Sequence, residues 1–493
     1  MSFIQTVRQK VPEQIMELAL LNTLIVSFEF VYLLLRYRFL NPIIPLWFTK
    51  PWGEAQLADK SSIVLIPLTS LVVVIVSTVL SVLNKKTFIR YGSVLLLVVA
   101  TFCNSLLLMA LIRIINRAST AFSPLIDPNY VKLFFPFVLA FALVYLITPR
   151  FIEFVKKRNI VTDPSIHAHP GMLLKKPSAR GGGVIFSIAF SAATLLVARP
   201  SVQVMGIVFA VLTTAVIGFL DDVANTNPYS KLKLFGNPVF RLLVLQPIPV
   251  LFVFFSGVRI NNIGGIFQLN DYLVRIGSED FAPLAIFFTL LWMIWVMNML
   301  SFSNGVDGQY SGIVGISSVI IAILSLRFSS LTANQLDMAK IAAITAGAGF
   351  ALTKYTWHPS KIMWGFSATS AGIILATLSI VSVTKIAIAV LVLLIPFLDA
   401  VITVVRRALQ GKAPWKGDRG HLHHLLLERG WSVPKIATFY WITTAVLGAT
   451  ALFSSEKNLP LVVLTLSGVV AFILIVLNLK SEAASLKKQL LEK

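Results

Sequence analysis

The fold is decided by a stretch that reads FAPLAIFFTLLWMIWVMNML (281–300), followed directly by SFSNGVDG (301–308). The first part has 20 residues and no charged side chain. At a rise of ~1.5 Å per residue it makes a helix of about 30 Å, the thickness of the hydrocarbon core of a bilayer. The second part is polar and contains Asn-Gly and Asp-Gly, the dipeptides of turns. Together the two parts predict a membrane-spanning helix that ends in a polar loop.

Apolar runs of this kind recur along the chain of 493 residues, of which 57% are hydrophobic and 13% charged, with a mean hydropathy of +0.84. Soluble proteins are about 45–50% apolar and ~25% charged, so this composition excludes an ordinary globular enzyme, a disordered chain and a fibrous repeat. We predict an all-α, polytopic integral membrane protein, a helical bundle of about 14 transmembrane helices. The expected spans are residues 17–37, 62–83, 94–115, 131–149, 182–198, 202–220, 239–257, 281–300, 309–326, 338–353, 366–381, 385–404, 436–454 and 459–479.

The charged residues are mostly basic, with 42 Lys and Arg against 21 Asp and Glu and a net charge of +21. In a soluble protein this balance would indicate a nucleic-acid partner. Here it follows the positive-inside rule of membrane proteins, and we expect no nucleic acid. With a cytoplasmic N-terminus, most basic loop residues fall on the cytoplasmic side, in loops 84–93, 150–181, 221–238, 301–308, 354–365 and 405–435. We therefore expect a multi-pass protein of the cell membrane whose polar motifs lie on the cytoplasmic face.

The distribution of polar motifs divides the chain into three parts. Residues 1–125 hold three expected spans without a polar cluster, and we predict an extra N-terminal three-helix region of unknown role. Residues 126–480 hold every polar motif and form the predicted functional core of about 11 helices. Residues 481–493 are expected to form a cytoplasmic amphipathic tail.

The first candidate site is the acidic pair Asp221 and Asp222, at the cytoplasmic end of an expected span. Adjacent carboxylates near lipid repel each other unless a cation or a basic partner neutralises them. A hard cation such as Mg²⁺ can bridge such carboxylates to a diphosphate. Lys231 and Lys233 follow in the same loop and can hold phosphate oxygens. The alternative is a solvated helix end flanked by ordinary positive-inside lysines.

The second candidate is the loop from Asn298 to Gly308, which contains Asn304 and Asp307. Amide and carboxylate side chains can read the donor and acceptor edge of a base or a sugar. The glycines of this loop allow a tight turn and a close approach to a ligand. The alternative is a plain turn.

The third candidate is DRGHLHH (418–424), which contains half of the six histidines. Imidazole is a common metal ligand, but no cysteine or second histidine cluster completes a zinc site. We expect His421, His423 and His424 to bind phosphate or steer a proton, with Arg419 beside them. The alternative is chance clustering. The scattered histidines are expected to be structural, and they are His167, His169 and His358.

The fourth candidate is the basic, glycine-rich loop KKPSARGGG (175–183), which includes Lys176 and Arg180. It opens an expected span, so free backbone N–H groups and the positive end of a helix face the cytoplasm. This favours an anion site, and the alternative is a positive-inside flank. Because all four motifs emerge on one face, they favour a metal-assisted reaction between a phosphorylated cytosolic substrate and a partner in the membrane.

In this order the four motifs resemble the polyprenyl-phosphate N-acetylhexosamine-1-phosphate transferase family (glycosyltransferase family 4), over about residues 130–455. The run DRGHLHH is the most specific part, and it is similar to the bacterial undecaprenyl-phosphate N-acetylglucosamine-1-phosphate transferase type. The resemblance implies transfer of a sugar phosphate from a UDP-N-acetylhexosamine to polyprenyl phosphate, with release of UMP. It also implies Mg²⁺, with Mn²⁺ as a substitute, contact with membrane lipid and the first membrane step of a cell-envelope glycan pathway. A homodimer is left open.

The resemblance also implies roles for the candidate residues. Asp221 and Asp222 would lie at the metal and lipid-phosphate end, Asn298 near the metal and the diphosphate, and Asn304 and Asp307 at nucleoside-binding positions. The expected catalytic residues are Asp221, Asp222, His421, His423 and His424, and the expected metal ligands are Asp221, Asp222 and Asn298. The expected substrate-binding residues are Asn298, Asn304, Asp307, Lys176, Lys231, Lys233, Arg180 and Arg419.

The chain departs from the resemblance at one motif. The family usually has Met-Gly-Asp-x-Gly-Ser, which supplies a further metal carboxylate, whereas residues 363–370 here read MWGFSATS, with Phe366 and no acid. Metal coordination is therefore expected to differ. Two alternatives stay open: a non-catalytic relative of the family, and a multispan transporter of a phosphorylated solute, for which Asp399 is the main intramembrane acid.

Overall fold

The structure, a computed structural model, divides into two compact units, unit 1 (Met1–Ala142) and unit 2 (Leu143–Lys493). The boundary falls inside helix α5 (Pro128–Lys157). The predicted boundary after residue 125 lies outside the described residues, and the predicted division of the chain stays a prediction. The structure describes residues 13–47, 50–51, 53–83, 87–119, 128–164, 177–227, 231–263, 267–269, 272–276, 279–326, 332–381, 385–413, 419–455 and 458–491.

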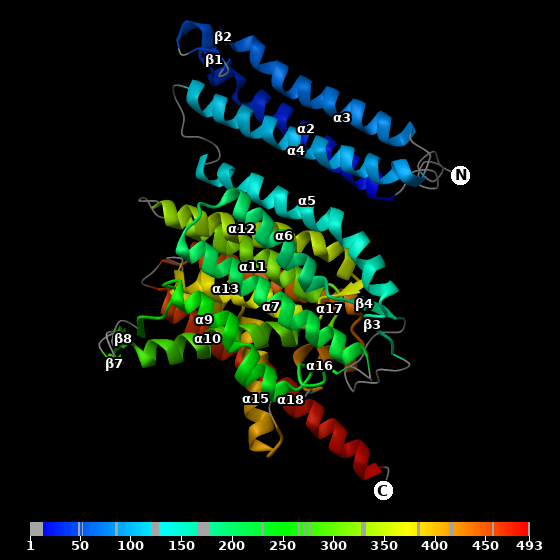
Figure 1. Ribbon diagram of the computed structural model, residues 1–493, viewed down its shortest axis with the longest axis vertical. Coiled ribbons are helices and arrows are strands. Elements are labelled where there is room, and N and C mark those ends of the chain that lie inside the picture. The colour runs from blue at the N-terminus through cyan, green and yellow to red at the C-terminus, as the bar shows by residue number, and fades with distance from the viewer. Residues whose placement is uncertain are drawn as a thin grey trace. The chain divides into compact units, whose positions relative to one another are not determined.

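Unit 1 is a bundle of three long helices, α2 (Glu13–Arg36), α3 (Leu65–Leu83) and α4 (Thr87–Ala118), followed by the first half of α5 (Figure 1). Its core is aliphatic, and Ile44, Ile63 and Leu111 are fully buried. Buried amides cross-link the helices, since Asn104 Nδ2 donates to Asn22 Oδ1 at 2.9 Å. Such small polar links are typical of membrane bundles. The short elements of unit 1 are η1 (Tyr37–Phe39), β1 (Ile43–Pro45), η2 (Glu54–Gln56), β2 (Leu57–Asp59) and η3 (Lys60–Val64).

Unit 2 is a larger bundle that carries all the polar motifs, and α5 contributes its second half. Its helices are α6 (Gly182–Val197), α7 (Val202–Thr226), α8 (Pro238–Phe240), η4 (Arg241–Leu245), α9 (Pro247–Phe255), α10 (Pro283–Phe302), η6 (Ser303–Gly305), α11 (Gln309–Ser325), α12 (Ala333–Thr356), η7 (Phe366–Ala368), α13 (Thr369–Val381), α14 (Lys385–Val392), α15 (Leu394–Leu409), α16 (Leu422–Glu428), α17 (Val433–Phe453) and α18 (Leu459–Leu491). Its strands are β3 (Val161–Thr162), β4 (Ser178–Arg180), β5 (Asn262–Ile263), β6 (Phe267–Gln268), β7 (Val274–Ile276), β8 (Glu279–Phe281) and β9 (Ile362–Met363).

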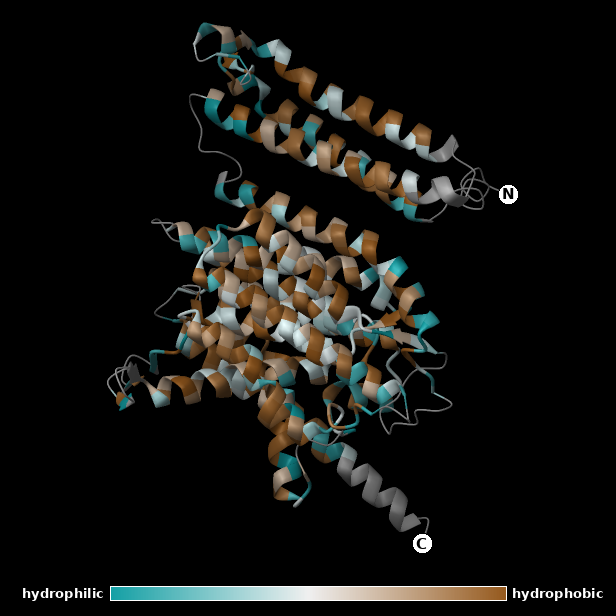
Figure 2. Cartoon of the chain, in the orientation of Figure 1, coloured by the Kyte–Doolittle hydropathy of each residue, from teal (hydrophilic) through white to brown (hydrophobic). Residues whose placement is uncertain are grey.

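The helices confirm the class of a polytopic helical membrane protein. Among the described residues, ten helices are long and apolar enough to cross a membrane, or up to eleven if each bent pair counts as one span. Three shorter apolar helices cover Gly182–Val197, Gln309–Ser325 and Phe366–Val381. Each of the expected spans overlaps a helix, and a total of about 14 requires that these three also cross. Figure 2 shows apolar residues along the helices and polar residues mainly at their ends and in the connections.

The range 385–404, predicted as one span, is divided between two helices. α14 and α15 meet at Leu393 with a bend of 87°. Pro396 explains the break, because a proline has no N–H to donate four residues back, to the carbonyl of Val392, and its ring crowds that carbonyl. The bend places Asp399 in the second turn of α15. At the other end of the sequence the expected tail 481–493 continues helix α18, which runs to Leu491.

A small sheet holds the basic loop beside the helix ends. β3 pairs antiparallel with β4, with Val161 opposite Ala179, and β4 pairs parallel with β9, with Arg180 beside Met363. Figure 1 shows β3, β4 and α16 along one side of unit 2. The sheet thereby joins the loop that carries Arg180 to the loop that leads into Phe366.

Candidate active site

The acidic pair lies in the last two turns of α7, whose first turn is capped by the side chain of Ser201. Asp221 is 2% exposed and Asp222 is fully buried. Each carboxylate is paired with an arginine, since Arg241 Nη1 lies 2.7 Å from Asp221 Oδ1 and Arg180 Nη1 lies 3.5 Å from Asp222 Oδ1. The pair is therefore neutralised by guanidinium groups of the chain itself.

Arg241 reaches Asp221 because of an unusual helix start. Asn237 accepts hydrogen bonds from the backbone N–H groups of Val239 and Phe240, and Pro238 fixes the first turn. A π turn then begins at Arg241, closed by Gln246 N–H donating to Arg241 O at 2.9 Å. Turns of this kind occur frequently at functional sites.

The loop that contains Phe366 completes the surroundings of the acidic pair. Phe366 N–H donates to Asp222 Oδ1 at 3.1 Å, and the guanidinium of Arg241 lies 4.3 Å from the centre of the Phe366 ring. Gly365 has φ +69°, and a Cβ at this position would overlap the Asp222 carboxylate. Among the described residues Asp222 Oδ2 is a buried oxygen without a hydrogen-bond donor.

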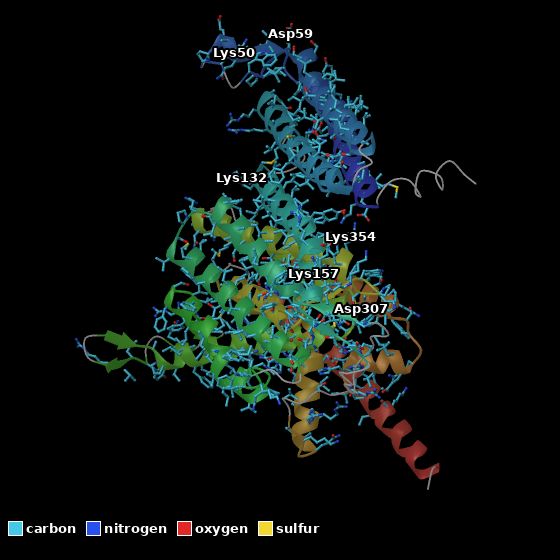
Figure 3. All side chains as sticks on the ribbon, turned by 45° about the vertical axis from the view of Figure 1, so that its right-hand side comes forward. Lys50, Asp59, Lys132, Lys157, Asp307 and Lys354 are labelled. Carbon is cyan, nitrogen blue, oxygen red and sulfur yellow. The ribbon has the colours of Figure 1, made fainter. Side chains whose placement is uncertain are left out.

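The residues of the second motif turn toward separate partners. Asn298 exchanges two hydrogen bonds with Gln246, at 2.8 Å and 3.2 Å. Asp307 accepts from His358 Nδ1 at 2.8 Å and from Ser360 N–H at 3.2 Å. Asn304 is half-buried in the turn between α10 and α11. Figure 3 labels Asp307 on the right-hand side of unit 2.

The histidine cluster packs against this same turn. His421 Nδ1 lies 2.9 Å from Asp399 Oδ2, and Leu422 N–H donates to Asp399 Oδ1 at 2.8 Å, so one carboxylate on α15 anchors the start of α16. The rings of His421 and His423 lie parallel, with centres 5.8 Å apart. His423 Nε2 lies so close to Gly305 that a Cβ there would overlap it.

Burial keeps two of these imidazoles neutral. It lowers the pKa of His423 well below the ordinary value, and the neighbouring His424 and His421 lower that pKa further. Burial also lowers the pKa of His424, with further contributions from His421 and Arg419. Neutral imidazoles donate or accept single hydrogen bonds, so His423 and His424 can bind phosphate as hydrogen-bond donors but not as fixed cations.

One loop connects the acidic pair to the turn with Asn304 and Asp307. Tyr310 OH donates to Ala368 O at 2.5 Å, and Trp364 Nε1 donates to Ser311 Oγ at 2.8 Å. Residues 362–368 therefore contact Asp222 on one side and the start of α11 on the other. The structure brings together the acidic pair, the basic loop, the polar turn and the histidine cluster in unit 2.

The remaining predicted residues take varied places. Arg180 is fixed in β4, where Nε donates to Thr162 Oγ1 at 2.6 Å. Arg419 is exposed at the start of the histidine run. Lys231 and Lys233 are exposed on the turn before α8, and among the described residues neither forms an ion pair with the acidic pair. Lys176 lies outside the described residues, as do His167, His169 and Asp418.

The donor set does not fit a preformed site for a divalent cation. Mg²⁺ requires near-octahedral oxygen ligands. Here one oxygen of each carboxylate is already bonded to an arginine, the Asn298 amide is bonded to Gln246, and Asp222 Oδ2 is buried without a hydrogen-bond partner. The described residues contain no group of three His, Cys, Asp or Glu side chains that could hold a metal ion. The predicted metal roles of Asp221, Asp222 and Asn298 gain no support from this geometry.

Sequence reasoning missed three contributors to the site. Arg241 is the only charged residue in the expected span 239–257, and an ionisable residue within a span is by default a functional candidate. Gln246, in the same span, offers a weaker signal of the same kind. His358 was expected to be structural, and no spacing rule connects it to Asp307, which lies 51 residues earlier.

Comparisons with known proteins agree on one family. A family model described as Glycosyl transferase family 4 matches residues 204–383. A phospho-N-acetylmuramoyl-pentapeptide-transferase of Clostridium beijerinckii is 25% identical over 324 residues, which cover 64% of this chain and 94% of that protein. A decaprenyl-phosphate N-acetylglucosaminephosphotransferase of Mycolicibacterium smegmatis is 25% identical over 336 residues, which cover 62% of this chain and 79% of that protein.

Proposed function

We propose that this chain, which belongs to glycosyl transferase family 4, is a membrane phosphotransferase that moves an N-acetylhexosamine-1-phosphate from a UDP-sugar to polyprenyl phosphate. The products would be a polyprenyl-diphosphate sugar and UMP, in the first membrane step of a cell-envelope glycan pathway. The observation that carries the proposal is that residues 362–368 join the arginine-paired carboxylates to the polar turn, and that the buried His423 packs against Gly305 of the same turn. We place the activity in residues 126–480.

The chemistry is an exchange of phosphate bonds. An oxygen of the lipid phosphate forms a bond to the phosphorus that carries the sugar, and the bond from that phosphorus to the bridging oxygen breaks, so that UMP leaves with the bridging oxygen. The attacking phosphate is already anionic near neutral pH, because its second pKa is ~6, and it needs no general base. Such reactions depend mainly on positioning and on charge stabilisation.

Each group of residues has a place in this proposal. Arg241 and Arg180 supply positive charge beside the reacting phosphates, and the exposed Lys231, Lys233 and Arg419 attract the anionic donor. Asn304 and Asp307 offer amide and carboxylate groups to the nucleoside. His423 packs against the polar turn, with the rings of His421 and His424 beside it, and the three histidines hydrogen-bond the diphosphate or the sugar.

The proposal also covers the membrane, the face on which the site lies, the donor and the oligomeric state. The active face is cytoplasmic and the membrane is the plasma membrane, which the excess of basic residues in the expected inner loops supports. The donor is a UDP-N-acetylhexosamine, and a homodimer stays a hypothesis. The resemblance implies Mg²⁺, but because the described carboxylates do not fit a cation site, no step of this mechanism is assigned to a metal.

The test is UMP release by the purified protein, with polyprenyl phosphate and a panel of UDP-hexosamines, together with detection of the lipid product. We expect Asp222→Asn to lose at least about 100-fold in rate, since removing one partner of a buried pair costs ~3–5 kcal/mol of local interaction. The matched control is Asp337→Asn, because Asp337 is also buried and paired, with Arg199 at 3.2 Å and Lys340 at 3.0 Å. UDP-sugar binding without any turnover would identify a non-catalytic relative instead.

A further inference from the structure

The acidic pair of unit 2 is electrically balanced without any ion. Two buried carboxylates, Asp221 and Asp222, face two guanidinium groups, at 2.7 Å and 3.5 Å. The side chains of Arg241 and Arg180 are only 20% and 24% exposed, so they are largely withdrawn from water with their partners. Taking such charges out of water costs several kcal/mol per ion, which close pairing must offset. The four side chains together carry no net negative charge that would attract a divalent cation.

Phe366 holds this arrangement in two ways. Its backbone N–H binds Asp222, and its ring lies under the guanidinium that binds Asp221, with 4.3 Å from the ring centre to Arg241 Cζ. A cation over an aromatic face gains about 0.5–2 kcal/mol, more as the contact is withdrawn from water. One residue therefore fixes both halves of the charge balance.

An acidic residue at position 366 would change the electrostatics of the site. It would add a third carboxylate beside Asp221 and Asp222 and would remove the ring that supports Arg241. Carboxylate oxygens without basic partners are the ligands that a hard divalent cation prefers. The aromatic residue at 366 and the arginine at 241 thus form a matched pair that favours a guanidinium over a metal ion.

We propose that Arg241, held by Phe366, takes with Arg180 the place of a divalent cation at the Asp221–Asp222 pair, so that sugar-phosphate transfer by this chain does not require a metal. The inference rests on the proposed function. A guanidinium matches the two-oxygen edge of a phosphate, and the Arg241 side chain remains 20% exposed. Arg241 is then a positive charge that belongs to the chain itself.

The first arm of the test compares UMP release by the full chain in EDTA and in Mg²⁺. We expect rates within about twofold of each other, because the positive charge belongs to the protein. A loss in EDTA of about tenfold or more that Mg²⁺ restores would overturn the inference.

The second arm measures Mn²⁺ binding by calorimetry and by electron paramagnetic resonance, and it does not depend on activity. Wild-type protein should show no saturable Mn²⁺ site, whether UDP-sugar is present or absent. The double variant Phe366→Asp with Arg241→Gln should bind Mn²⁺ at least about tenfold more tightly than the matched variant Phe366→Asn with Arg241→Gln, which lacks the added acid. A saturable site in wild type, or equal affinity in the two double variants, would contradict the proposal.

The third arm tests Arg241 in the reaction. Arg241→Gln should lower the rate by about 100-fold or more, Arg241→Lys by less, and Phe366→Leu by about 2–20-fold, since leucine keeps the N–H but loses the ring. The control is Arg199→Gln, which removes an arginine paired with a buried aspartate elsewhere in unit 2 and should leave the rate unchanged. If Arg241→Gln does not fold, the wild-type arms and Arg241→Lys still decide the question.

These arms separate the inference from the proposed function. Absence of UMP release under every metal condition would contradict the proposed function, while Mn²⁺ binding would still decide which charge neutralises the acidic pair. Turnover only with Mg²⁺ would support the proposed function and overturn the inference.

Discussion

Gly365 controls how closely the loop before Phe366 approaches the acidic pair. Its φ of +69° lies in the left-handed region, and a Cβ at this position would overlap the Asp222 carboxylate. We expect Gly365→Ala to lower the stability by about 1–2 kcal/mol from the backbone and another 1–3 kcal/mol from overpacking, and to reduce UMP release severely. The control is Gly411→Ala, because Gly411 has φ +66° with open space around it, so only the backbone cost remains. Equal effects in thermal melts would contradict the close packing described above.

His423 makes the stability of the protein depend on pH. Its buried imidazole has a lowered pKa, so below about pH 6.5 the unfolded state takes up a proton that the folded state does not. The free energy of unfolding therefore decreases as the pH falls through 6.5, by about 1.4 kcal/mol per pH unit at most, until the lowered pKa of the folded state is reached. Thermal melts in detergent between pH 5 and pH 8 should show this decrease, and His423→Gln should flatten it. An unchanged slope in the variant would rule out His423 as its source.

At the scale of elements, the break between α14 and α15 matters because it brings Asp399 to the histidine run. Pro396 was visible in the sequence as a helix breaker, yet the apolar run 385–404 has the length of a span, and hydropathy carries no information about a bend. The structure uses the bend to place one carboxylate at the first residues of α16. We infer that α15 positions His421 for its contact with substrate.

Asp399→Asn tests that positioning role. Asparagine keeps an acceptor for Leu422 N–H but loses the charge that faces His421, so we expect UMP release to fall about tenfold, or ~1.4 kcal/mol. In a double-mutant cycle with His421→Gln the two losses should fall short of additivity by about 1 kcal/mol, because both remove the same interaction. Additive losses would show that Asp399 does not act through His421, and Asp337→Asn again serves as the control.

The helices and the short motifs could be predicted from the sequence, whereas the contacts between distant segments could not. Apolar runs predicted the helices because a membrane span must satisfy its own backbone hydrogen bonds, and local composition alone records this requirement. The motifs predicted Asp221, Asp222 and the clustered histidines as candidate site residues, because each motif is a short run of neighbouring residues in the chain. Tertiary packing brings together partners from distant segments, such as Arg241 with Asp221 and His358 with Asp307. The periodicity of a single sequence does not predict such contacts.

At the scale of the whole molecule, the three short helices decide the topology of unit 2. The start of α6 lies by the end of α7, since Arg180 pairs with Asp222 near that end, and α7 is long enough to cross a membrane. The start of α11 lies by the end of α12, where Ser311 and Thr356 share a hydrogen bond of 2.7 Å. The start of α13 lies beside Asp222, and Ser379 near its other end accepts from Trp292 of α10. Each short helix therefore starts beside the end of a full-length helix. We expect each of the three to run antiparallel to that helix and to cross the membrane with it.

Cysteine labelling tests this topology, starting from a Cys103→Ser background that removes the only native thiol. Lys231 and Gln410 are exposed at the end of unit 2 that carries the polar motifs, and Arg259 and Asn458 are exposed in loops expected on the other side. Because basic loops stay in the cytoplasm, an impermeant maleimide on intact cells should label Arg259→Cys and Asn458→Cys, and it should label Lys231→Cys and Gln410→Cys only after permeabilisation. The inverse pattern would place the site outside the cell, away from a cytosolic nucleotide sugar, and would contradict the proposed function. Labelling of Arg259→Cys and Asn458→Cys on opposite sides would instead show that at least one of the helices between them does not cross, because an even number of crossings joins the two positions.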